Sequence, residues 1–243
     1  MILFVAGDIF GRIHELYDRV FALEAKLGVR ADWVLQTGNF GVFPDSLRAD
    51  AHIRRQGGLD FVDLYYNKQG VPRPTLFVEG PHEDHDWLAL KKSRGELELL
   101  PNLHLLWNGF KTQIGNNETD VSVVGLGKVY SEKTYRATEK RSEKRAMRHY
   151  TRGEVERACS QGPTDILLLH QAGYGRRIGP FVSNSEGISK IGFAVRPQLI
   201  VHGAYNISAT YDAEQGTPSL ALAYGEVRAI TWSPSSFAYS VLS

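Results

Sequence analysis

The sequence predicts a single α/β domain whose first half alternates strands with helices and whose second half is richer in strands. Short apolar runs ending in Gly-Asp, Thr-Gly or Glu-Gly alternate with stretches of helical periodicity three times near the start of the chain. The 243 residues lie near the upper size of one hydrophobic core, and the apolar fraction of 42% is ordinary for a globular chain. One domain spanning residues 1–243 is therefore expected.

The first half begins with a continuous apolar run, Ile2–Ala6, which predicts a buried strand. Apolar residues at helical spacing follow, and Gly28 is the residue type typical of a helix C-terminus. The same signals predict four further elements: a strand at Trp33–Leu35, a helical stretch at Ser46–Asn67 broken near Gly57-Gly58, a strand at Thr75–Val78, and a helix over about Asp84–Arg94.

The second half is predicted to hold many short strands and one basic helical region. Gly115–Thr119 is a turn sequence that joins two strand candidates as a hairpin. The basic region, Lys128–Arg157, contains ten Lys or Arg and five Glu. The strand candidates are Leu103–Trp107, Phe110–Ile114, Val121–Val124, Ile166–Leu169, Leu199–Val201, Ser208–Tyr211, Leu220–Tyr224, Val227–Thr231 and Phe237–Val241.

Composition excludes several classes of protein. With 28 Lys and Arg against 27 Asp and Glu, the net charge of +1 gives the whole chain no electrostatic preference for nucleic acid or anionic lipid. The single cysteine, Cys159, excludes an internal disulfide and a thiolate zinc site. Asp8 interrupts the first apolar run, which also lacks the basic flank of a signal peptide. We expect a cytoplasmic protein that does not associate with membranes.

Polar residues follow five of the predicted strands. They are Asp8, Asn39, the pair His82-Glu83, His170, and the segment Gly203–Asn206. Ligands of open α/β sheets bind outside the carboxyl ends of the strands. These residues therefore predict a cleft at one end of the sheets.

In order along the chain, these loops resemble the five motifs of the calcineurin-like metallophosphoesterase superfamily. The matching segments are Gly7-Asp8-Ile9-Phe10, Gly38-Asn39-Phe40-Gly41, Gly80-Pro81-His82-Glu83, Leu169-His170 and Gly203-Ala204-Tyr205-Asn206. The resemblance implies a four-layer α/β/β/α sandwich with two mixed β-sheets, and the predicted order of strands and helices agrees with it.

Within that superfamily the chain is most similar to the RNA lariat-debranching branch. The segments that carry this similarity are Asp60–Tyr66, Pro74–Val78, Asn102–His104 and Pro163–Ile166.

The metal ligands that the resemblance implies are mostly replaced. The family holds two divalent metals that activate a bridging hydroxide. Asp8 and His170 match ligand positions, and Asn39 replaces the bridging carboxylate. Four further ligand positions are occupied by Phe10, Pro81, Ala204 and Asn206. One carboxylate and one imidazole are too few ligands for two transition-metal ions, so no cofactor is expected. The alternative is one Mn, Fe or Zn ion held by Asp8, Asn39 and His170.

His82 matches a family position that contacts the scissile phosphate and assists the leaving group. Alternatively, His82 has no role in catalysis and only fills its place in the loop with hydrogen bonds. The first functional hypothesis is a metal-free cleft that binds a phosphate-bearing small molecule or a protein partner. Its expected ligand contacts are Asn39, Glu83, Tyr205, Asn206, Arg176 and Arg177. The two arginines lie in a glycine-rich loop, for which the alternative interpretation is an ordinary surface loop with no ligand contact.

The alternative hypothesis is a divergent phosphoesterase-fold hydrolase with at most one metal. Asp8, His82 and His170 would then be its catalytic acid–base residues. A third hypothesis is RNA binding through Lys128–Arg157, a segment whose simplest interpretation is a solvated helix surface.

Overall fold

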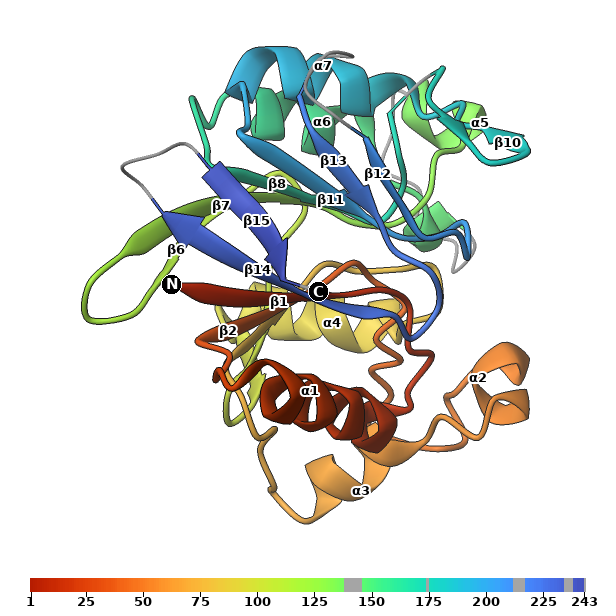
Figure 1. Cartoon of the computed structure of the whole chain (residues 1–243). Coiled ribbons are helices and arrows are strands. Elements are labelled where there is room, and N and C mark those ends of the chain that lie inside the picture. The colour runs from red at the N-terminus through yellow and green to blue at the C-terminus, as the bar shows by residue number, and fades with distance from the viewer. Residues whose placement is uncertain (138–145, 174, 212–216, 234–237, 243) are drawn as a thin grey trace.

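The computed structural model describes residues 1–137, 146–173, 175–211, 217–233 and 238–242 (Figure 1). Two β-sheets face each other, and helices cover the outer face of each sheet, so that the chain forms a four-layer α/β/β/α sandwich (Figure 1). The fold class predicted from the sequence is confirmed.

The first sheet has parallel strands at its centre and antiparallel strands at both edges. Its seven strands lie in the order β15-β14-β1-β2-β3-β5-β4. β1, β2, β3 and β5 run parallel, whereas β14, β15 and β4 pair antiparallel with their neighbours. The bounds are β1 Ile2–Ala6, β2 Trp33–Gln36, β3 Thr75–Phe77, β4 Glu98–Leu100, β5 Leu103–Leu105, β14 Val227–Ser233 and β15 Ala238–Leu242.

The second sheet repeats this plan with six strands in the order β12-β13-β11-β8-β7-β6. β7, β8, β11 and β13 are parallel, and β6 and β12 are antiparallel edge strands. A separate pair, β9 with β10, forms a small hairpin. The bounds are β6 Lys111–Gly115, β7 Asp120–Leu126, β8 Ile166–Leu169, β9 Arg177–Ile178, β10 Phe181–Val182, β11 Leu199–His202, β12 Ala209–Tyr211 and β13 Ser219–Ala221.

Alternation along β1 shows how the layers are assembled. Leu3 and Val5 pack into the core between the two sheets, whereas Phe4 and Ala6 pack into the core beneath the helices of the first sheet. Successive strand residues point to opposite faces, so an uninterrupted apolar run serves two cores at once.

Helices α1, α3 and α4 cover the first sheet, and α6 and α7 cover the second (Figure 1). Gly28 ends α1 in the left-handed conformation, as expected. None of the described helices is long and apolar enough to cross a bilayer. The helix bounds are α1 Ile13–Leu27, α2 Ala51–Arg55, α3 Asp60–Tyr66, α4 His85–Ser93, α5 Glu132–Tyr135, α6 Arg152–Cys159 and α7 Glu186–Val195, with a 3-10 turn at Ala146–Arg148.

The prediction of one basic helical region over Lys128–Arg157 is wrong for the described residues. Two short helices and a 3-10 turn replace it, and Val129 forms an isolated β-bridge with His149. The reason is local, because Thr151 and Glu154 make a capping box that starts α6 as a new helix. The most basic part of that segment, residues 138–145, lies outside the described residues.

Candidate functional site

The carboxyl ends of parallel strands in both sheets bring the predicted loops together. Asp8 follows β1 and Asn39 follows β2, while His170 and Ala204 follow β8 and β11 of the facing sheet. Hydrogen bonds join these loops across the two sheets, so the site is a single constellation.

Asp8 lies at the centre of this constellation and is fully buried at 0% exposure. One carboxylate oxygen accepts a hydrogen bond from the Asn39 side-chain amide at 2.7 Å, and the other accepts from the Ala204 backbone N–H at 3.2 Å. Burial raises the pKa of Asp8, against the opposing effects of His170 and of these hydrogen bonds. Both of its oxygens therefore already have partners within the protein.

Asn39 is held by both ends of its side-chain amide. The Nδ2 atom donates to Asp8, and Oδ1 accepts from the backbone N–H of His82 at 3.0 Å. Because one partner is an acceptor and the other a donor, the amide orientation is determined by its neighbours. Asn39 also has a backbone φ of 53°, a left-handed conformation that asparagine tolerates better than most residues.

His170 is 1% exposed, and its Nδ1 lies 2.8 Å from the carbonyl oxygen of Thr37. A carbonyl only accepts, so Nδ1 carries the proton in the neutral ring. Burial lowers the pKa of His170, although the nearby Asp8 opposes this effect. The ring belongs to the floor of the site and presents almost no surface to solvent.

Phe10 occupies the position where the family resemblance implies a histidine ligand. Its ring is 3% exposed and packs edge-on against His52 at 4.7 Å, Tyr224 at 5.0 Å and His82 at 5.9 Å between ring centroids. The phenylalanine therefore fills this part of the site with an aromatic cluster and offers no donor atom to a metal.

His82 forms the partly exposed part of the site. Its Nδ1 lies 2.7 Å from Oδ2 of Asp50, and Arg148 approaches the same oxygen at 3.5 Å. The side chains of His82 and Asp50 are 23% and 19% exposed. Burial disfavours the charge on Asp50, but His82, the Ile53 N–H and Arg148 together hold its pKa well below the usual range.

Asp50 and His52 position His82 from the start of α2. Oδ1 of Asp50 caps the helix by accepting from the N–H groups of His52 and Ile53. The His52 ring stacks on His82 with a centroid distance of 4.5 Å and an interplanar angle of 23°. Burial, followed by the neighbouring His82, lowers the pKa of His52, which favours the neutral ring in the stack.

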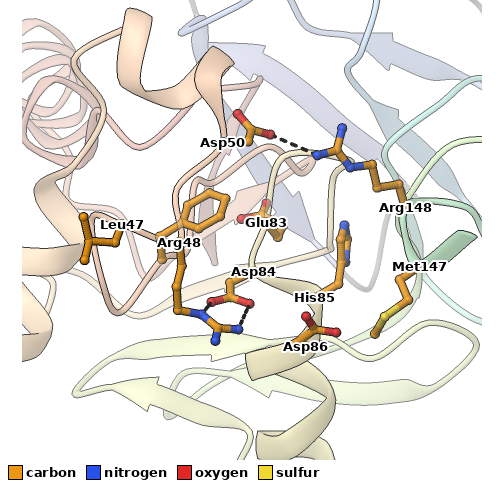
Figure 2. A pocket seen from close by; sticks show the side chains of 10 residues that line it. Leu47, Arg48, Asp50, Glu83, Asp84, His85, Asp86, Met147 and Arg148 are labelled. Carbon is orange, nitrogen blue, oxygen red and sulfur yellow. Dashed lines mark hydrogen bonds and ion pairs between the residues drawn. The ribbon is translucent and has the colours of Figure 1, made fainter. Parts of the chain in front are cut away.

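A cavity of about 260 Å³ is lined by Asp50, the partner of His82, together with Arg48, Asp84 and Arg148 (Figure 2). Two ion pairs cross its walls: Arg48 bonds Asp84 through both carboxylate oxygens, and Arg148 reaches Asp50. Figure 2 shows Arg148 projecting from the chain segment opposite Asp50. Arg48 and Arg148 are 45% and 41% exposed, so both guanidinium groups remain accessible.

Glu83 is one of the residues that line this cavity (Figure 2), and it also holds the loop after β2. Its carboxylate accepts from the backbone N–H groups of Phe40, Gly41 and Val42 at 2.7–2.9 Å. Burial raises the pKa of Glu83 to about 8, against the lowering effect of those N–H groups. At 5% exposure, its carboxylate supports the site from below.

The other expected contacts lie in different places. Asn206 is exposed and accepts from the backbone N–H of Tyr224 at 3.0 Å, next to the aromatic cluster. Tyr205 packs in a small core with Ala172 and Ile178. Arg176 and Arg177 line a separate cavity on the helix-covered face of the second sheet.

The cations of the basic segment are mostly paired within the protein, as far as the structure describes them. The partly buried Lys128 lies between Glu79 at 3.7 Å and Glu154 at 3.4 Å. Burial opposes both charges, yet the ion pairs hold the pKa of Glu79 at about 2 and raise that of Lys128. Arg152 pairs with Glu156 within α6.

The residues present do not fit a binuclear metal centre. Among the residues that the structure describes, no group of three or more His, Cys, Asp or Glu is placed to hold a metal ion. Asn39 directs an N–H donor at Asp8, where a bridging ligand would direct lone pairs at two cations.

Sequence reasoning missed four residues of the site: Asp50, His52, Arg148 and Tyr224. They lie outside the strand-end loops and carry no local motif. The one available signal was Asp50 as a candidate helix N-cap, which indicates α2 but no functional role.

No protein-family model and no curated protein sequence matches this chain. Solved structures do match. TT1561 of Thermus thermophilus aligns over 99% of this chain and 97% of its own, with 15% identity and a TM-score of 0.59. A second solved structure aligns over 99% and 98% at 15% identity, with a TM-score of 0.60. The phosphopantetheinyl hydrolase PptH of Mycobacterium tuberculosis aligns over 92% and 90% at 12% identity, with a TM-score of 0.50. These likenesses establish the fold of this chain, which is that of the metallophosphoesterases.

Proposed function

We propose that this protein uses the metallophosphoesterase fold as a metal-free binding domain whose strand-end cleft takes a phosphate-bearing ligand. The observation that carries the proposal is the closed hydrogen-bond network of Asp8, Asn39 and His82. Both oxygens of Asp8 and both polar atoms of the Asn39 amide are engaged within the protein, and Nδ1 of His170 bonds Thr37, so these retained positions serve mainly to brace the loops. Their role is to hold the loops in the family's geometry.

The partly exposed side chains of His82, Arg48 and Arg148 support a phosphate as the ligand group. Nδ1 of His82 is engaged by Asp50, which leaves Nε2 to face a ligand. Arg148 and Arg48 add two accessible guanidinium groups, the side chain best suited to phosphate oxygens. Asp50 and Asp84 share those arginines, so a phosphate competes with two carboxylates. We therefore expect modest affinity that weakens as salt is added.

Titration with phenyl phosphate, followed by NMR of ¹³C-labelled histidine rings, tests this proposal. The His82 and His52 signals should shift with a common saturation curve. His82→Ala and Arg148→Ala should each weaken binding by about tenfold, which corresponds to one charge-assisted hydrogen bond. Arg152→Ala is the matched control, because Arg152 is 71% exposed and pairs with Glu156 within α6, away from the cavity that Arg48 and Arg148 line. Absence of saturable binding, or an equal effect of Arg152→Ala, would contradict the proposal.

One observation favours a second candidate, a metal-independent acid–base enzyme. The His82–Asp50 pair at 2.7 Å has the geometry that orients an imidazole for proton transfer. Asp8 and His170, at 0% and 1% exposure, would then act only by positioning. Such a pair supplies about 10²–10⁴-fold, which suits a labile ester.

Hydrolysis of bis(4-nitrophenyl) phosphate in EDTA tests the second candidate. An enzyme of this kind should show turnover that Asp50→Asn and His82→Ala both lower by about 10²-fold or more. A wild-type rate equal to that of buffer alone rules this candidate out and leaves the binding proposal intact.

A further inference from the structure

A cavity of about 690 Å³ lies on the outer face of the second sheet, away from the strand-end site. Helix α7 crosses β8, β11 and β13 on this face (Figure 1). The cavity is enclosed by those strands, by α7, and by the segment that leads into β9. Its volume is within the range of pockets for small organic ligands.

Two polar side chains form the floor, His202 on β11 and Ser219 on β13. Their neighbours Val201 and Leu220 pack between the sheets, so alternation turns His202 and Ser219 to the helix-covered face. Each is 1% exposed. Neither ring nitrogen of His202 nor the Ser219 hydroxyl has a hydrogen-bond partner among the described residues.

Such groups are costly in a folded protein. Most buried polar side chains find a partner, and an unpaired group loses its hydration without compensation. Burial lowers the pKa of His202 to about 4, so the ring is neutral at pH 7; the Gly203 backbone opposes this effect more weakly, although it does not meet the geometry of a hydrogen bond to either ring nitrogen. A neutral imidazole offers one donor and one acceptor. A ligand that supplies the complementary groups would remove the penalty.

Gly192 contributes an independent argument from the wall of the cavity. It lies within α7, where glycine is less favourable than alanine, and a Cβ built on it meets no atom within 4 Å. A side chain at position 192 would therefore clash with no neighbouring atom, so close packing does not explain why this residue is glycine. Gly192 lines the cavity, so its lack of a side chain adds to the open space there.

The open end of the cavity carries positive charge. Arg176 lies over the ring of Tyr211 at 4.8 Å, and Arg177 is exposed. Both side chains line the same cavity, whose walls include Leu169 and Ile188. Guanidinium groups at the solvent side suit a carboxylate or a phosphate, and the walls suit an apolar body.

We propose that this cavity is a second binding site, for a small organic anion with an apolar or aromatic body. Its hydrogen-bonding end reaches His202 and Ser219, and its anionic end meets Arg176 and Arg177. The site is separate from the strand-end cleft and does not depend on the function proposed for that cleft.

The minimal probe is 4-hydroxybenzoate, which has a hydroxyl, an aromatic ring and a carboxylate. With ¹³C-labelled histidines, its addition should shift the His202 ring signals with one saturation curve and leave those of His82 in place. Phenol, which lacks the carboxylate, should bind about tenfold or more weakly. Failure of 4-hydroxybenzoate to shift His202 at millimolar concentration would overturn the proposal, as would a shift of His82 alone.

Two variants on α7 separate filling of the cavity from disturbance of the helix. Gly192→Phe places a ring in the open space and should abolish the His202 shift. Ala194→Phe adds the same ring at a neighbouring exposed position outside the cavity lining and should leave binding unchanged. Equal binding by both variants, or equal loss in both, would contradict the assignment.

His202→Phe distinguishes a ligand contact from a structural histidine. Replacing an unpaired ring by an apolar one should raise the thermal midpoint of the free protein and weaken 4-hydroxybenzoate by about tenfold. A lowered midpoint with unchanged affinity would assign His202 to the core and not to a binding site.

Discussion

At the scale of single residues, the chemistry of the cleft depends on an amide at position 39. A carboxylate there would present lone pairs in every direction, whereas Asn39 presents a donor to Asp8 and an acceptor to the His82 backbone. The Asn39 amide stabilises the ionised form of the buried Asp8 by hydrogen bonding, whereas a carboxylate at this position would repel it.

Asn39→Asp should therefore destabilise the protein and not restore an enzyme. It removes the donor to Asp8 and adds a second buried carboxylate, so we expect a loss of about 2–3 kcal/mol in the free energy of unfolding at pH 7. The new carboxyl must have a raised pKa beside Asp8. Its penalty should shrink as pH falls through that raised pKa, because the protonated form can donate again.

Urea unfolding at pH 5 and pH 7, with and without 1 mM Mn²⁺, measures this effect. Asn184→Asp, at an exposed position before α7, is the control and should change stability by less than about 0.5 kcal/mol. Full recovery of Asn39→Asp stability by Mn²⁺ would mean that the site still holds metal and that the interpretation of Asn39 is wrong.

His202 gives a pH dependence of known sign. Its folded pKa of about 4 lies below the ordinary value of 6.5, so the unfolded chain binds the extra proton first. Stability should be constant above about pH 6.5 and should fall by roughly 3 kcal/mol as pH drops towards 4. His202→Phe should remove this contribution. If the free energy of unfolding falls equally below pH 6.5 in the wild type and in His202→Phe, His202 is hydrated or paired in solution.

At the scale of elements, two glycines near helix ends illustrate opposite uses of the same residue. Gly28 ends α1 with φ of 64°, where a side chain is strained, whereas Gly153 lies in α6 with open space around its Cβ position and no positive φ. Gly28→Ala should cost about 1 kcal/mol, and Gly153→Ala should add about 0.5–1 kcal/mol. Thermal unfolding of the two variants measures both changes, and a gain at Gly28 would contradict the capping argument.

Most elements could be predicted because each follows from a local pattern. The apolar run of β1 and the periodicity of α1 gave elements with the observed positions. Helix α7 was missed although Ile188, Ile191 and Val195 recur at helical spacing, and the β9–β10 hairpin was missed because each of its strands has only two residues. The basic segment misled because charge composition favours a solvated helix, while the capping box at Thr151 and Glu154 divides it.

The site was predictable only where it follows strands. Asp8, Asn39 and His170 come directly after parallel strands, so topology alone brings them together. Asp50 and Arg148 reach His82 through tertiary packing from segments far apart in sequence, which no local pattern reports. Arg176 and Arg177 were expected over the strand-end cleft, but the segment that leads into β9 places them at a different cavity, on the outer face of the second sheet.

At the scale of the whole molecule, the core between the sheets joins both halves of the chain. Leu3 of β1 and Leu168 of β8 pack in it together with Trp33 and Trp232. Leu168→Ala should lower the free energy of unfolding by about 2–5 kcal/mol and should shift the tryptophan-fluorescence and far-UV circular-dichroism transitions equally. Two separate transitions would show that the sheets belong to independent domains.

The most direct measurement of the central claim is the metal content of the purified protein. The protein would be produced in medium supplemented with Mn²⁺, Fe²⁺ and Zn²⁺, gel-filtered without chelator, and analysed by inductively coupled plasma mass spectrometry. Because Asn39 closes the network around Asp8 and the described residues provide no cluster of three ligands, we predict well below one tightly held transition-metal ion per chain. Two such ions per chain would contradict the account.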